Sequence, residues 1–109
     1  ISELKKIASL AESYYIPISP HDASGPINVM AGAQVMMTVP NFYKLETHRY
    51  DLGLYDRIID KPLNVKSGDL YLDDQPGLGV NLEVEALKKY AVDVQFKPAY
   101  DPKNEKVKM

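Results

Sequence analysis

The chain has 109 residues, of which 45% are hydrophobic and 26% are charged, and it carries a net charge of -2. That balance fits one folded domain rather than a disordered segment, and it argues against a nucleic-acid partner, because phosphate binding needs concentrated Lys and Arg. The sequence contains no Cys, so a disulfide framework and a zinc site built from thiolates are excluded.

The first predicted elements are a helix over residues 2–13 and a short strand over 15–19. Apolar side chains recur in the helix at the spacing of one face, while Lys5, Lys6 and Glu12 occupy the other face. The apolar positions are Ile1, Leu4, Ile7, Ala8, Leu10, Ala11 and Tyr14. The strand follows directly and is rich in Tyr and Ile, which favour extended structure.

A second helix is predicted over residues 26–39, and a second strand over 41–46. Gly25 and Pro26 favour a helix start, because Pro at the first helical position loses no hydrogen bond, and the helix stops before Pro40. Its residues are apolar nearly all round, so we expect it to be largely buried, with its Met residues in the core. These are Met30, Met36 and Met37. The segment is too short to span a bilayer, so we expect no membrane partner.

Helices and strands alternate in the first half of the chain, which predicts a parallel α/β sheet with crossover helices. Two strands cannot form a parallel sheet that buries both faces, so this half needs more strands than the chain contains. The chain also begins without Met and already inside a helical pattern. We therefore expect a cut through a larger domain, with an expression or processing artefact as the alternative.

The second half follows a different pattern. Residues 48–59 predict a loop with a short helical piece, and residues 61–80 predict a hairpin whose turn includes Gly68. A last short helix follows, with Asn81 as a candidate cap, although residues 81–83 allow other starts. Residues 93–109 are rich in Pro and Lys and are expected to be an extended tail.

Two ionisable side chains follow the two predicted strands at corresponding positions: His21 just after the first, and Glu46 at the end of the second. Ligands of α/β proteins bind at this edge, because the loops there vary freely while the strands hold them in place. A lone His or Glu at such a position is more often a surface residue, but the pair makes both of them catalytic candidates. Asp22 is a candidate substrate contact, although a turn-forming Asp is the more common case.

A family resemblance comes from two stretches of the sequence. The end of the barrel in the enolase superfamily, mandelate racemase subgroup, resembles "ISELKKIASLAESYYIPISPHDASGPINVMAGAQVMMTVPNFYKLE". The segment that follows that barrel is similar to "KPLNVKSGDLYLDDQPGLGVNLEVEALKKY", in which "DQPGLGV" is especially typical. The stretch "HDASGP" looks most like the acid-sugar dehydratases such as galactonate dehydratase, with Asp22 where Asn is common.

The resemblance implies an α/β fold: the last two strands and helices of a (β/α)8 barrel over residues 1–60, a hairpin and helix over 61–92 that return to an α+β capping domain, and a tail over 93–109. It implies a Mg2+-dependent dehydratase that abstracts the proton α to a carboxylate and eliminates the β-hydroxyl. His21 would be the general base, or the acid that helps hydroxide leave, and Glu46 would hydrogen-bond the substrate carboxylate. The Mg2+ ligands are expected upstream, so no metal ligand is predicted in this chain.

The implied partners are a small acid-sugar carboxylate, the remainder of the barrel and the capping domain, in a cytoplasmic homo-oligomer. The isolated chain is expected to be inactive, since a complete barrel needs about 250 residues. Two alternatives remain open: a racemase or epimerase of the same superfamily, and a small α/β binding module without catalysis.

Overall fold

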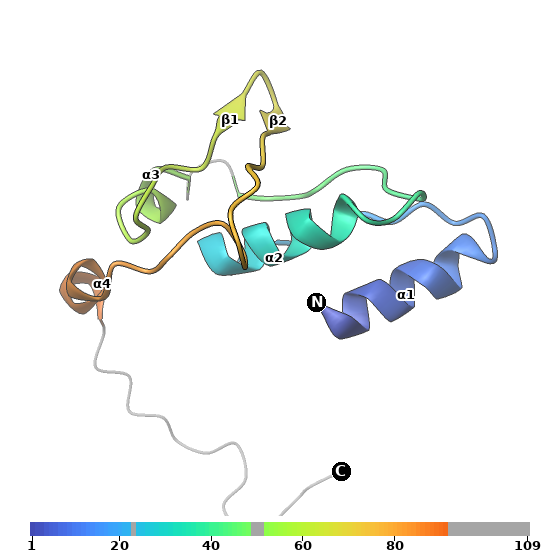
Figure 1. Ribbon diagram of the computed structural model, residues 1–109, viewed down its shortest axis with the longest axis horizontal. Coiled ribbons are helices and arrows are strands. Elements are labelled where there is room, and N and C mark those ends of the chain that lie inside the picture. The colour runs from blue at the N-terminus through green and yellow to red at the C-terminus, as the bar shows by residue number, and fades with distance from the viewer. Residues whose placement is uncertain (23, 49–51, 92–109) are drawn as a thin grey trace, which may run out of the picture.

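The structure, a computed structural model, describes residues 1–22, 24–48 and 52–91 (Figure 1). Its elements are α1 (Ser2–Glu12), α2 (Pro26–Met36), α3 (Leu52–Tyr55), β1 (Val65–Lys66), β2 (Asp69–Leu70) and α4 (Val84–Tyr90). The four predicted helices are confirmed, and the two long ones end slightly earlier than their patterns suggest. The tail predicted over residues 93–109 lies outside the described residues.

α1 ends in a turn that takes up the first residues of the first predicted strand. Tyr15 has a positive φ of 57°, and its N–H donates to the carbonyl of Glu12 at 2.9 Å. The N–H of Ile16 donates to the carbonyl of Ala11, also at 2.9 Å. A left-handed residue with these two bonds commonly closes a helix. The prediction that a strand begins at residue 15 is therefore wrong, because Tyr15 belongs to the helix end.

Two isolated parallel bridges stand where the two strands were predicted. Ile18 pairs with Phe42, and His21 pairs with Glu46. The parallel arrangement agrees with the sequence pattern, but neither segment is a continuous strand. The second bridge lies beyond the predicted end of the first strand, so the pairing reaches the candidate residues themselves.

Pro20 explains why the pairing is interrupted. In a regular parallel ladder the N–H two residues after Ile18 would donate to the neighbouring segment, and Pro has no N–H. The second segment also carries one extra residue between the two bridges, as in a β-bulge. In this gap the hydroxyl of Ser19 donates to the carbonyl of Lys44 at 2.8 Å. The N–H of Glu46 then donates to the carbonyl of Pro20 at 3.0 Å and resumes the pairing.

α2 is largely buried, as its apolar composition predicts. Pro26 occupies the first helical position, and Gly25 precedes it with a φ of 149°, which glycine adopts far more readily than other residues. The buried residues of the helix are Pro26, Val29, Met30, Gly32, Ala33, Val35 and Met36. Met37 follows the last helical residue and is 74% exposed, so the prediction that it packs in the core is wrong.

The core lies between α2 and the second half of the chain. Val29 and Met30 of α2 pack with Tyr55, Ile59 and Leu63. Partly buried apolar side chains surround this cluster: Leu45, Leu52, Leu70, Leu72, Leu78 and Val80. Residues 52–80 therefore cover α2 and bury its apolar side chains.

α1 lies beside α2 but contributes little to the core (Figure 1). The ammonium of Lys5 donates to the carbonyl of Thr38 at 2.7 Å, which ties α1 to the chain just after α2. Ala8 is the buried residue of α1. Ile7 and Leu10, on the predicted apolar face, are exposed. Much of that face is thus uncovered in the described part of the chain.

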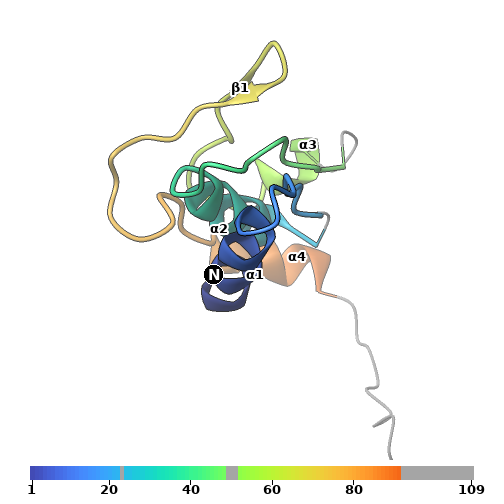
Figure 2. The ribbon, with the colours of Figure 1, turned by 90° about the vertical axis from the view of Figure 1, so that its right-hand side faces the viewer.

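β1 and β2 form the predicted hairpin, with Val65 opposite Leu70. Ser67 and Gly68 connect the strands with positive φ angles of 53° and 94°. Two successive positive φ angles give a turn whose twist matches that of the paired strands. The turn projects away from the helices (Figure 2).

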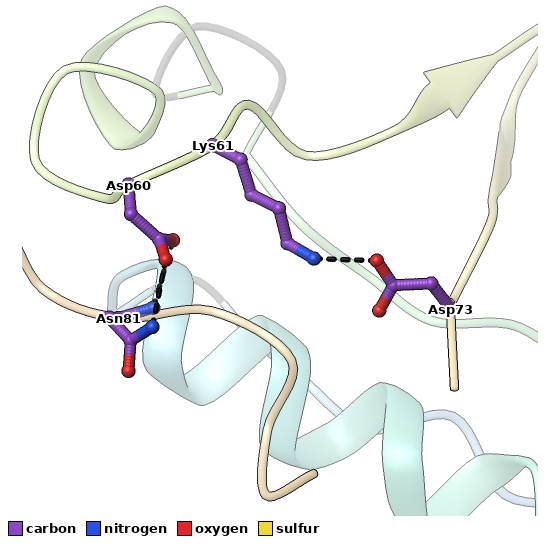
Figure 3. A network of polar contacts seen from close by, with 4 residues as sticks. All are labelled: Asp60, Lys61, Asp73 and Asn81. Atoms are coloured by element: carbon purple, nitrogen blue, oxygen red, sulfur yellow. Dashed lines mark hydrogen bonds and ion pairs between the residues drawn. The ribbon is translucent and has the colours of Figure 1, made fainter. Parts of the chain in front are cut away.

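Two polar contacts tie the chain after the hairpin to the residues before it (Figure 3). The carboxylate of Asp60 accepts hydrogen bonds from the backbone N–H of Asn81 at 2.9 Å and from its side-chain amide at 2.8 Å. Lys61 and Asp73 form an ion pair at 2.5 Å. Asn81 bonds to Asp60, and of the possible starts over residues 81–83 the helix uses the last. The N-cap is Glu83, and it makes no side-chain capping bond.

Replacing Val29 with Ala should lower the free energy of unfolding by about 2 kcal/mol, because Val29 is 1% exposed and the variant leaves a cavity beside α2. Met37→Ala, just after the other end of the same helix, is the control, and its exposed position should keep the change within about 0.5 kcal/mol. Denaturant unfolding measures both variants. Equal losses would contradict the assignment of Val29 to the core.

Replacing Asp60 with Ala should speed hydrogen–deuterium exchange at the backbone N–H of Asn81, because that N–H loses its acceptor. The bonds from Asn81 also lower the pKa of Asp60 from its ordinary value of 3.8. The contact therefore contributes stability above pH 3.8 and loses it as the pH falls through the lowered pKa. Asp74→Ala, in the exposed loop nearby, is the control. Unchanged exchange at Asn81 in the Asp60 variant would contradict this account of the loop.

Candidate functional site

His21 and Glu46 lie next to each other at the carboxyl ends of the two paired segments. The backbone bridge sets the two residues opposite each other, and Nε2 of His21 lies 3.9 Å from Oε1 of Glu46. The sequence predicts the two residues at corresponding strand ends, and the structure brings their side chains together. The catalytic role of each stays a prediction.

The pair is open to solvent, since the side chains of His21 and Glu46 are 72% and 63% exposed. Water screens an exposed ion pair, and this one exists only when His21 is protonated, so the contact contributes little to stability. An imidazole takes up and releases a proton near neutral pH, and a neighbouring carboxyl group accepts or donates a hydrogen bond. The arrangement can therefore move a proton to or from a molecule bound over this edge.

Asp22 follows His21 but turns its side chain toward α2. The residue is 5% exposed, and its Oδ1 accepts a hydrogen bond from the side-chain amide of Asn28 at 2.7 Å. Its Oδ2 has no hydrogen-bond partner and lies against Gly32. The backbone N–H of Asp22 donates to the carbonyl of Glu46 at 2.9 Å. Asp22 thus contacts both the paired segment and the helix beneath it.

Burial raises the pKa of Asp22 above its ordinary value of 3.8, because the charged form loses hydration, while the charge of His21 acts in the opposite direction. The sequence left two roles open for Asp22, as a loop-forming residue and as a substrate contact. Its buried position favours the first role, since the carboxyl group is turned away from the open edge.

Asn28 and Gly32 belong to the surroundings of Asp22, and the sequence interpretation did not single them out. The two residues are four apart in α2, so they share one helix face. A Gly inside an otherwise helical and apolar pattern is the signal that could have pointed to them, because such a Gly often marks a close approach. The pattern alone does not say what approaches.

No group of three or more His, Cys, Asp or Glu side chains that could hold a metal ion occurs within residues 1–22, 24–48 and 52–91. The same part of the chain contains no helix of the length and apolar character needed to cross a membrane.

Comparison with known proteins gives the same family from sequence and from structure. The sequence model described as enolase C-terminal domain-like matches residues 1–87. D-xylonate dehydratase of Haloferax volcanii is 38% identical over 91 residues, which are 84% of this chain and 22% of that enzyme. Other relatives are also named as dehydratases of acid sugars. The chain thus spans about a quarter of the length of these relatives.

Two solved structures resemble the described fold. A mandelate racemase/muconate lactonizing enzyme-like protein from Rubrobacter xylanophilus DSM 9941 is 36% identical with a TM-score of 0.76, over 84% of this chain and 24% of that one. A protein from Burkholderia xenovorans strain LB400, solved bound to magnesium and fumarate, is 30% identical with a TM-score of 0.70, over 77% of this chain and 21% of that one.

The raised pKa of Asp22 predicts a pH dependence that Asp22→Asn should remove. A carboxyl group with a raised pKa in the fold contributes stability below its unfolded pKa and loses that contribution as the pH rises through the folded pKa. The Asn variant should therefore gain stability relative to the unaltered protein as the pH rises above 3.8. Denaturant unfolding over a pH series measures the difference, with Asp74→Asn as the control. A difference that shrinks with rising pH would contradict the direction of the shift.

Proposed function

We propose that this chain, which belongs to the enolase superfamily through the family described as enolase C-terminal domain-like, is part of a Mg2+-dependent acid-sugar dehydratase. The relatives named above support the dehydratase, and the racemase-like neighbour supports the mandelate racemase subgroup. The observation that carries the proposal is the 3.9 Å approach of His21 to Glu46 at an open strand edge.

The proposed place of the chain is the end of the catalytic barrel. Residues 1–60 would supply its last two strands and helices, residues 61–92 would pack on a capping domain, and residues 93–109 would form the tail. The uncovered apolar face of α1, with Ile7 and Leu10 exposed, supports this placement because neighbouring parts of a barrel would cover it. By itself the chain would be inactive. The complete enzyme would be a homo-oligomer.

The proposed reaction begins at the carbon next to the substrate carboxylate. His21 takes the α-proton, and the electron pair of the broken C–H bond passes into the carboxylate to give an enediolate. The Cα=Cβ bond then forms as the Cβ–O bond breaks, and the β-hydroxyl leaves with a proton as water. The enol that remains tautomerises to a 2-keto-3-deoxy acid. His21 would act as the base in the first step, or as the acid in the second.

Glu46 would bind the substrate carboxylate and support the enediolate. Because a carboxyl group donates a hydrogen bond only when it is protonated, Glu46 would carry a proton while it contacts these oxygens. Donation toward developing negative charge is the kind of interaction that strengthens in the transition state. The open position of Glu46 leaves it free to do so.

Mg2+ does not fit a site within the described residues, which lack a group of three possible ligands. We propose that its ligands come from other parts of the complete barrel, and the neighbour solved with bound magnesium supports this proposal.

A racemase or epimerase of the same superfamily is the second candidate, because a neighbour is described as mandelate racemase-like. Both reactions share the loss of the α-proton and differ in the next step. Return of the proton gives an epimer, and loss of the hydroxyl gives the keto acid. The names of the relatives favour dehydration.

Replacing His21 with Asn in the full-length protein should lower the exchange of the substrate α-proton with deuterium by about 100-fold or more, because proton transfer by a positioned side chain contributes about 10²–10⁴-fold. Proton NMR of an acid sugar in deuterated water measures the exchange. Lys88→Gln on α4 is the control and should exchange normally. Retained exchange in the His21 variant would remove His21 from the mechanism.

A product screen separates the candidates. Incubation of the full-length protein with acid sugars and Mg2+ should yield 2-keto-3-deoxy acids. If only α-epimers accumulate, the dehydratase proposal is wrong and the epimerase candidate replaces it. If the protein binds an acid sugar but converts none of those tested, the chain belongs to a binding protein without catalysis.

A further inference from the structure

We propose that Asp22 is a positioning residue, whose buried carboxyl group seats against Gly32 of α2 and thereby holds His21 opposite Glu46. The inference rests on the proposed function for its activity readout, but its structural part concerns this chain alone. It assigns a task to the one buried charged residue among those described, and to a glycine that an apolar helix does not otherwise need.

The first link is between Asp22 and the strand end. The N–H of Asp22 donates to the carbonyl of Glu46 at 2.9 Å, and the N–H of Glu46 donates to the carbonyl of Pro20 at 3.0 Å. These two bonds enclose the bridge between His21 and Glu46. Any displacement of the Asp22 backbone would therefore change the approach of the two candidate side chains.

The second link is between Asp22 and α2. The amide of Asn28 donates to Oδ1 at 2.7 Å, so the first turn of the helix holds one carboxyl oxygen. The same residue, Asp22, also donates its backbone N–H to the strand end. One residue thus connects the candidate site to α2, through its backbone on one side and its side chain on the other. The side chains of His21 and Glu46 are mostly exposed, so they are not held by burial in the same way.

The third link is the room that Gly32 provides. A Cβ atom at position 32 would overlap Oδ2 of Asp22 and would lie 2.8 Å from its Cγ. Glycine is a poor residue for a helix interior compared with Ala, so its presence here matches the space that the carboxyl group takes. Gly53, the glycine of α3, differs in this respect, because a Cβ atom added there would meet no atom within 4 Å.

The carboxyl group is not what packing alone would select. Its Oδ2 is buried without a hydrogen-bond partner, an arrangement that destabilises a fold, and an apolar side chain would suit the surrounding helix better. Features that a fold retains against its own stability are found where function requires them. At Asp22 the required function would be to hold the neighbouring His21 in place.

The test compares Gly32→Ala, Asp22→Ala, the double variant and Asp22→Asn in the full-length enzyme, with Gly53→Ala as the matched glycine control. Gly32→Ala and Asp22→Ala should each lower kcat by about 10- to 100-fold with a smaller change in KM, because a displacement near 1 Å at a catalytic group has effects of this size. The double variant should regain thermal stability, since the new methyl group fills the space of the lost carboxyl, while its kcat stays low.

Asp22→Asn should keep kcat within about 3-fold because it keeps the shape and the bond to Asn28. Gly53→Ala should behave like the unaltered enzyme.

Recovery of both stability and kcat in the double variant would overturn the proposal, because Asp22 would then only fill space. Equal kcat values in Asp22→Ala and Asp22→Asn would overturn it as well. Hydrogen exchange at the backbone N–H of residue 22 supplies a readout that needs no substrate: it should be slow in the unaltered protein and in Asp22→Asn, and faster in both Asp22→Ala variants. If the unaltered enzyme turns over no acid sugar, the proposed function fails, and this exchange measurement still decides whether Asp22 holds the strand end.

Discussion

The parallel pairing of residues 18–22 with residues 41–46 is the constraint on which the candidate site depends. His21 and Glu46 are mostly exposed, so packing of their own side chains does not place them. Their approach comes from backbone hydrogen bonds on either side of the bridge, from Asp22 to Glu46 and from Glu46 to Pro20. The backbone pairing therefore places the site while its side chains stay open to solvent, which suits a surface that receives a substrate and exchanges protons with it.

α2 supports this pairing from beneath. The helix is nearly all apolar, and its core contacts run through Val29 and Met30 to the second half of the chain. Asp22 enters that apolar surface through the space above Gly32, with Asn28 as its hydrogen-bond donor. α2 thus contributes to both the core and the candidate site. A change in the packing of this helix would therefore shift His21 and Glu46 through Asp22.

The described chain leaves apolar side chains uncovered, Ile7 and Leu10 of α1 among them, and it spans about a quarter of its relatives' length. Both observations agree with the proposal that the remainder of a barrel covers α1 and supplies the metal ligands. The family membership is independent of that proposal, since it follows from a match over residues 1–87. What the chain carries itself is the two strand ends, and the chemistry proposed for it is limited to the proton and carboxylate contacts that these residues can make.

The sequence by itself determined the helices, the hairpin and the corresponding positions of His21 and Glu46 in two parallel segments, because helical periodicity, Gly–Pro helix starts and turn residues act over a few neighbouring residues. Some expectations were wrong for local reasons, since Tyr15 closes α1 through hydrogen bonds at the helix end instead of starting a strand, and Met37 just after α2 is exposed. At Asn81, a candidate cap of α4, a contact with the distant Asp60 decided the outcome. Only the tertiary structure decided that the two candidate side chains meet and that Asp22 is buried against Gly32. Contacts between segments distant in the sequence set these features, and local patterns carry no record of them.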